Sequence, residues 1–303
     1  MNKNTYKKFI TMFTKAVKKS KFEALFTILK YDYTYSDIKY ILKNVKKINA
    51  SYYKKAFGNL LPKKYSDLMG NHSTFLRKNN LEKEIIWQAI MIEEFHNEIN
   101  KFLRYKSEFE KKLLYGEYND AIKILDQVES NICVSLWSIE NRLIIEDLSN
   151  GIEANKNEFS RIASFEDNNL LKAIIQLIST RVEDSMSTNR YKNFINKLID
   201  SNTDMDVFLS YILDYPSLID NDLDLQTILF IESSNSIIDV YLAFINILTI
   251  LNIKNIDEHN LKNSINYKII TNLVNVINDP RLEKIIYIFN PQKPIKPFYR
   301  YDE

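Results

Sequence analysis

The chain has little of the two residues that most often interrupt helices. Among its 303 residues there are four Gly and six Pro, and no Pro lies between Pro62 and Pro216. Tight hairpin turns and phosphate-binding loops need Gly, because they use positive φ angles or bring the backbone close to a ligand. The four Gly are scattered, which excludes a Walker loop and a dinucleotide-binding fingerprint. A chain so poor in Gly and Pro is most simply helical.

Cysteine and histidine are also scarce. Cys133 is the single cysteine, which excludes a disulfide within the chain and predicts a reducing compartment, the cytoplasm. It lies in an apolar run, where a buried inert thiol is expected in preference to a nucleophile. Among the three His, only His96 stands in a metal-like pattern, with Glu93 three positions before it, and a di-iron bundle needs a second such pair. We therefore expect no metal, no cofactor and no catalytic activity.

The sequence has no apolar run long enough to span a membrane. The most apolar stretch, Ile237 to Leu251, is shorter than the roughly 20 residues that a spanning helix needs, and it contains Asp239 and Asn246. It is expected to be a core helix. Residues 1–21 lack the uninterrupted apolar segment of a signal peptide. We therefore expect a cytoplasmic protein without membrane contact.

Helical periodicity is abundant. From Ile85 to Leu113 apolar residues recur in steps of three, four or seven, which places them on one face of a single long central helix over about 81–115. Gly116 ends that helix, and similar patterns continue to about residue 290. The sequence predicts an all-α fold of antiparallel helical hairpins, with about a dozen or more helices. The segment 281–289 is rich in Ile and Tyr, so a short strand is the alternative there.

The segment from Pro62 to Asn80 combines Pro, Gly and clustered polar residues, which is typical of a boundary. The C-terminal tail has Pro at a spacing of three, the period of a polyproline II helix. Five parts are predicted on this basis: a basic N-terminal helical module (1–64), a linker (65–80), a central region of helical hairpins or repeats (81–200), a C-terminal helical region (201–290) and a Pro-rich extended tail (291–303).

One part of the central region resembles a known repeat. Gly116 and Gly151 are 35 residues apart, and each follows the last turn of a predicted helix. Trp137 lies near the start of the helix between them. A small–aromatic–small pattern is formed by Gly116, Tyr118, Ala121, Ile122, Leu125 and Val128. These residues resemble the tetratricopeptide repeat, with one good copy over about 102–135 and a degenerate one to about 170. The resemblance implies a partial α-solenoid, and a generic antiparallel bundle is the alternative.

Positive charge is concentrated at one end. Residues 1–64 hold sixteen Lys and three acidic residues, a formal charge of +13 that leaves −11 for the rest of the chain. Such a segment can contact phosphates, and its interleaved tyrosines can stack on unpaired bases. The alternatives are docking on the acidic body of the same chain, and contact with an anionic membrane, for which an aromatic-rich apolar face is lacking. The candidate polyanion-binding residues are Lys15, Lys18, Lys19, Lys43, Lys46, Lys47, Lys54 and Lys55.

Together these features predict a non-catalytic protein-interaction scaffold or adaptor subunit of a larger complex. Stacked helical hairpins leave one face exposed along their length, and a partner protein binds there. The alternative is a nucleic-acid-binding accessory protein that acts through the Lys-rich N-terminal module. A third hypothesis is an enzyme whose site is too divergent to recognise. A bacterial or phage conflict (defence) system is a possible setting for the first two.

Overall fold

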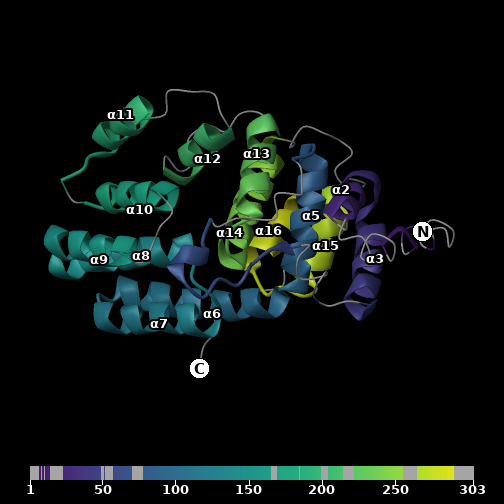
Figure 1. Ribbon diagram of the computed structural model, residues 1–303. Coiled ribbons are helices and arrows are strands. Elements are labelled where there is room, and N and C mark those ends of the chain that lie inside the picture. The colour runs from purple at the N-terminus through teal and green to yellow at the C-terminus, as the bar shows by residue number, and fades with distance from the viewer. Residues whose placement is uncertain are drawn as a thin grey trace.

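All regular elements of the structure are helices (Figure 1). The computed structural model describes residues 7, 9, 11–13, 23–48, 51, 57–69, 78–164, 169–183, 185–198, 204–213, 222–254 and 265–289. The elements are α2 (Glu23–Asp32), α3 (Tyr35–Ile48), the 3-10 helix η1 (Tyr65–Asp67), α5 (Leu81–Glu94), α6 (His96–Leu114), α7 (Tyr118–Asn131), α8 (Leu136–Asn150), α9 (Ile152–Ser164), α10 (Asn169–Arg181), α11 (Thr188–Leu198), α12 (Asp204–Leu213), α13 (Asp222–Glu232), α14 (Ile237–Lys254), α15 (Ile265–Val274) and α16 (Pro280–Phe289). No strand occurs in these ranges, so the all-α prediction is confirmed and 281–289 is helical.

The predicted continuous helix 81–115 is wrong, because two helices occupy that range. Phe95 separates α5 from α6 with φ −104° and ψ 25°. The two helices then run in clearly different directions (Figure 1). At the break, the His96 ring nitrogen Nδ1 lies 2.8 Å from the Glu93 carbonyl oxygen, which takes up hydrogen-bonding capacity at the end of α5. The apolar periodicity runs through Phe95 unbroken, so the sequence carries no sign of the change in direction.

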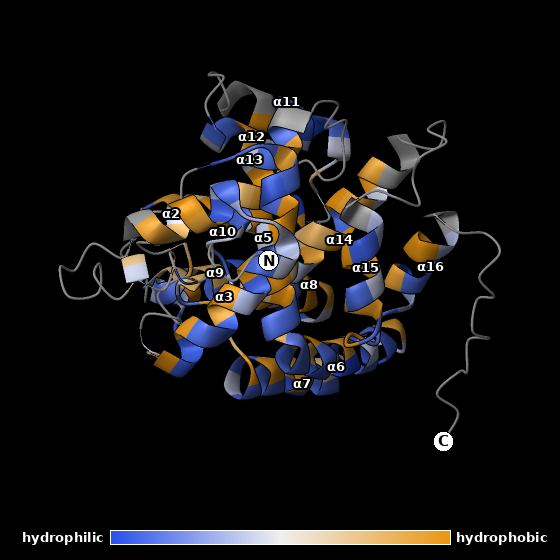
Figure 2. Ribbon diagram, turned by 90° about the vertical axis from the view of Figure 1, so that its right-hand side faces the viewer, coloured by the Kyte–Doolittle hydropathy of each residue, from blue (hydrophilic) through white to orange (hydrophobic). Residues whose placement is uncertain are grey.

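Helix α5 is the centre of the larger of the cores. Ile85, Ile86, Ala89 and Ile92 are at most 2% exposed although they point to different sides of the helix. A helix that is buried all round must have neighbours all round, and α5 contacts α2, α3, α13, α14 and α15. Figure 2 shows hydrophobic residues gathered along α14 in the interior and hydrophilic residues along α6 and α7 at the periphery.

Among the described residues, two smaller cores lie outside this one. One gathers residues of α8, α9, α10 and α11, together with Leu68 beside η1. The other joins α6, α7 and α8 through Phe109, Leu125 and Ile145. Trp137 on α8 connects this cluster with the α5 core, because its ring stands edge-on to Phe102 at 4.9 Å between ring centroids and also contacts Phe109.

Helix α14 occupies the apolar run at Ile237 and is a core helix, as predicted. Residues along its length, among them Ile238, Phe244 and Leu248, are at most 2% exposed. None of the described helices combines the length and the apolar character needed to cross a bilayer. The described part of the predicted linker packs against the α8–α11 core through Leu68, and the division into five parts stays a prediction.

Gly116 and Gly151 form the turns between α6 and α7 and between α8 and α9. Their φ angles are +70° and +80°, in the region that side chains with a Cβ atom rarely adopt. A Cβ added at Gly116 would meet no atom within 4 Å, so the need for Gly there is conformational and not steric.

We expect Gly116→Ala to lower the free energy of unfolding by about 1 kcal/mol, because alanine is disfavoured at positive φ. Gly116→Asn is the matched control. Asparagine tolerates this region better, so its cost should be smaller. Urea denaturation followed by circular dichroism measures both, and an equal loss for the two variants would contradict the conformational explanation.

Candidate interaction surfaces

Among the described residues of α2 and α3, three lysines pair with carboxylates of α5. The pairs are Lys30–Glu84, Lys39–Glu93 and Lys46–Glu94. The first is buried, at 1% and 0% side-chain exposure, and the other two are partly exposed. These lysines neutralise the negative charges of α5. Part of the positive charge of the N-terminal segment is therefore used in ion pairs that hold α2 and α3 against α5.

Other lysines of α3 face outward. Helix α3 buries Ile38, Ile41, Leu42 and Val45 against the α5 core, and its opposite side carries the exposed Lys43 and Lys47 beside Tyr40, which is 50% exposed. Of the eight predicted polyanion-binding lysines, the structure therefore places Lys43 and Lys47 on the outer face and Lys46 at Glu94. Lys15, Lys18, Lys19, Lys54 and Lys55 lie outside the described residues.

The turns at one end of helices α6–α9 expose large apolar side chains. Leu114 is 84% and Tyr115 77% exposed where α6 ends. Leu148 is 52% and Ile152 49% exposed on either side of the α8–α9 turn. Single exposed apolar residues are ordinary on protein surfaces, but groups of them mark interaction sites. We call these four residues the apolar tip.

The two turns of the apolar tip belong to the same end of the molecule. Leu113, which precedes Leu114, and Tyr118, which begins α7, pack on a cluster that contains Ile145 of α8. Ile145 lies three residues, less than one helical turn, before Leu148. Figure 1 shows α6, α7, α8 and α9 lying side by side, which agrees with these contacts. The four apolar side chains therefore border one surface.

A pocket of about 670 Å³ opens beside η1, toward the C-terminal end of α7. Lys63 shapes it, because its Nζ donates hydrogen bonds to the carbonyl oxygens of Ser130 (3.2 Å) and Ile132 (2.9 Å) at that helix end. The wall carries ammonium, hydroxyl and carboxylate groups, which can form hydrogen bonds with a polar group of a ligand. The lining residues are Lys63, Lys64, Tyr65, Ser66, Asp126, Glu129, Ser130 and Val134.

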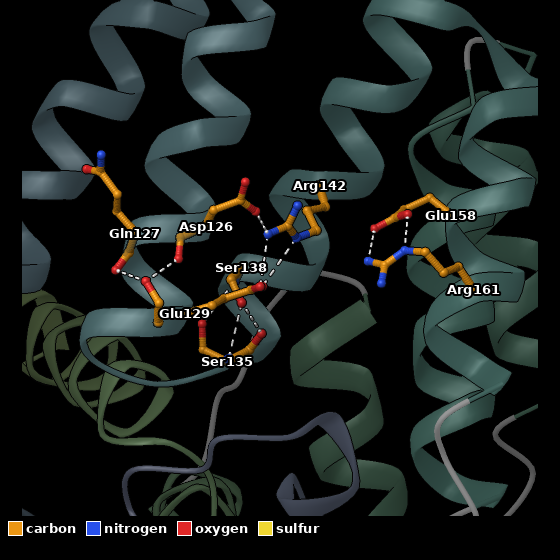
Figure 3. A network of polar contacts seen from close by, with 9 residues as sticks. Asp126, Gln127, Glu129, Ser135, Ser138, Arg142, Glu158 and Arg161 are labelled. Atoms are coloured by element: carbon orange, nitrogen blue, oxygen red, sulfur yellow. Dashed lines mark hydrogen bonds and ion pairs between the residues drawn. The ribbon is translucent and has the colours of Figure 1, made fainter.

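Asp126 and Glu129 of the pocket wall also belong to the polar network of Figure 3. Arg142 of α8 bridges to Asp126 at 2.5 Å and to Glu129 at 2.9 Å, which ties α8 to α7. Burial raises the pKa of Tyr65, and the charge of Glu129 raises it further, while Arg142 opposes the shift. A phenol held protonated beside paired charges is a hydrogen-bonding group and not a base. The arrangement therefore fits binding and structural support.

Buried polar residues also converge where three distant segments meet. The backbone carbonyl of Leu60 accepts from the Ile237 N–H, which starts α14. On α14, the Asp239 carboxylate accepts from the backbone N–H groups of Leu136 (3.0 Å) and Trp137 (3.1 Å), so it caps α8 from a neighbouring helix. It also accepts from the Ser236 hydroxyl at 2.7 Å. This junction fixes α8 against α14.

Ionisable groups at the junction are shifted toward their neutral forms. Burial raises the pKa of Asp239 to about 6 and that of Glu232, at the end of α13, to about 8, where the Asp239 charge adds to the effect. Burial, followed by Asp239, raises the pKa of the Cys133 thiol to about 12. At neutral pH the thiol is therefore protonated, which agrees with the inert role expected from its apolar run.

The Glu93–His96 pair, which the sequence offered as a metal-like pattern, has a structural role. The Glu93 carboxylate accepts from the Tyr35 hydroxyl at 2.5 Å and pairs with Lys39, while the His96 ring turns to the Glu93 carbonyl. Within the described residues, no group of three or more His, Cys, Asp and Glu side chains is placed to hold a metal ion. His72 and His259 lie outside those residues.

The sequence interpretation missed the apolar tip. The exposure of Leu114 could have been predicted from the sequence. Leu113 lies on the apolar face of α6 that packs in the core, and the next residue on a helix is rotated by about 100° away from that face.

No protein-family model matches the chain, and no curated protein and no solved structure matches it either.

Proposed function

We propose that the chain is a non-catalytic protein-interaction scaffold whose partner protein docks on the apolar tip. The observation that carries the proposal is the exposure of Leu114, Tyr115, Leu148 and Ile152 at one end of four packed helices. Removal of Leu and aromatic side chains from water drives protein association. Burial of these four side chains by a partner protein would therefore contribute favourable binding free energy. An apolar centre with charged residues around it is the usual anatomy of an interface.

The surroundings of the tip supply that polar rim. Lys111 and Glu117 lie beside the α6–α7 turn, and Glu153 follows the α8–α9 turn, all with exposed side chains. The packing of each helix from α6 to α9 against the next is compatible with the tetratricopeptide-like reading of residues 102–170. We include in the proposal that these helices form antiparallel hairpins of a partial, tetratricopeptide-like α-solenoid.

The test is site-specific photo-cross-linking in the cells that produce the chain. A photoreactive phenylalanine analogue at Tyr115 is expected to cross-link one discrete protein, and Leu114→Ser or Leu148→Ser should weaken binding of that protein about tenfold each, because buried Leu anchors carry on the order of 1–2 kcal/mol. Both side chains are exposed, so the fold should be retained.

The matched control is the same analogue at Tyr287 of α16, which is 39% exposed and lies on another helix. It should not cross-link that protein. The proposal fails if the chain is recovered only as a monomer without a bound protein, or if positions 115 and 287 cross-link the same proteins equally well.

A further inference from the structure

The outer face of α3 combines charge and an aromatic ring. Tyr40, Lys43 and Lys47 are separated by three and four residues, which places them in one row along a helix. The ring of Tyr40 is half exposed, and both lysines are exposed. In the part of the chain that the structure describes, neither Lys43 nor Lys47 forms an ion pair, whereas Lys39 and Lys46 of the same helix pair with α5. Among the described residues, therefore, no ion pair neutralises the positive charge of this row.

We propose that this row, which we call the α3 row, binds single-stranded nucleic acid. Tyr40 would stack on an unpaired base, and Lys43 and Lys47, about one helical turn apart, would contact the flanking phosphates. The +13 charge of residues 1–64 raises the local concentration of a polyanion and so favours the encounter. This site lies on a different helix from the apolar tip, so each proposal stands or fails separately.

The geometry favours a single strand over two other polyanions. In a duplex the bases are stacked on one another, so a tyrosine on the face of a helix meets only the backbone. An anionic membrane requires apolar side chains that insert beside the charges. The apolar side of α3 is already used in the core, where Ile38, Ile41, Leu42 and Val45 are at most 2% exposed. The Tyr40 ring is half exposed on the opposite side of α3, where a base can stack on it.

Fluorescence anisotropy with a labelled 20-nucleotide thymidine oligomer, at a series of salt concentrations starting from about 50 mM, tests the site. Tyr40→Leu is expected to weaken binding about tenfold, whereas Tyr40→Phe retains the ring and should bind as the wild type does. Lys43→Gln combined with Lys47→Gln should weaken binding and lower the slope of log K against log salt by about 1.4, which is two phosphate contacts at about 0.7 each.

The matched control is Lys123→Gln combined with Lys268→Gln, which removes the same charge from exposed positions on other helices and should leave binding unchanged. Circular dichroism checks that each variant is folded. Absence of single-strand binding by the wild-type chain at about 50 mM salt overturns the proposal. So does binding that is insensitive to Tyr40→Leu, and so does equal affinity for a 20-base-pair duplex or for vesicles of anionic lipid.

Discussion

Replacement of Lys30 by Met is expected to lower the free energy of unfolding by about 3–5 kcal/mol. The Lys30 ammonium lies 2.7 Å from Glu84 Oε2, and the two side chains are 1% and 0% exposed. Without Lys30, the Glu84 carboxylate keeps the backbone N–H of Asn79, at 2.7 Å from Oε1, but loses its counter-charge in a dry environment. Burial already lowers the pKa of Lys30 and raises that of Glu84, so each charge depends on the other.

Lys39→Met and Lys46→Met are the matched controls, because they remove the same group from the same segment. Their partners on α5 are partly exposed, so each loss should be within about 1 kcal/mol. Lys30→Met combined with Glu84→Leu should recover much of the stability, since no unpaired charge remains. Urea denaturation of the four variants measures this. A Lys30→Met cost no larger than that of Lys39→Met would contradict the assignment.

The buried pair also bears on how independent the basic segment is. Removal of residues around Lys30 would expose Glu84 and the apolar surface that α2 and α3 cover on α5. The helices of residues 23–48 therefore form part of the same hydrophobic core as α5 and α14. A contact of nucleic acid with the α3 row would be made by a surface that is rigidly joined to the body.

Helix positions followed from local information in the sequence. The core helix predicted from Ile237 is α14, and the segment 281–289 coincides with α16 apart from one residue. These helices could be predicted because apolar periodicity and the placement of Gly are properties of neighbouring residues. At the start of α3 the Asp37 backbone N–H donates to Thr34 Oγ1 at 3.3 Å, so Thr34 caps this helix.

Tertiary features had no such local signal. The change in direction at Phe95 depends on what α5 and α6 pack against, and Phe95 satisfies the apolar spacing of either arrangement. The partners of Lys30 and Asp239 lie 54 and about 100 positions away along the chain, so only the folded structure identifies them. Within the junction, the spacing of Ser236 and Asp239 does indicate a helix start, because Ser followed three residues later by an acidic residue is typical there. The contact of Asp239 with the start of α8 could not be predicted from the sequence.

Glu232→Gln is expected to remove a large part of the pH dependence of stability. The unfolded chain releases the Glu232 proton near pH 4.5, whereas burial and the Asp239 charge hold it in the folded chain up to about pH 8. Between these values the folded state binds more protons, so stability falls as the pH rises. The shift corresponds to a loss on the order of 4 kcal/mol from pH 4.5 to pH 8. Asp239, with its pKa raised to about 6, adds to the fall below that pH.

Glutamine at position 232 stays neutral and retains an oxygen that can accept from Asn235 Nδ2, now 2.8 Å from Glu232 Oε2. Urea denaturation near pH 5 should therefore give similar stabilities for the two proteins, and near pH 8.5 the variant should be the more stable. Glu82→Gln, at an exposed position of α5, is the control and should keep the profile of the wild type. Parallel profiles for wild type and Glu232→Gln would show that Glu232 is ionised in the folded chain. In that case the junction would hold two charged carboxylates, and a hydrogen-bond donor would have to face each of them.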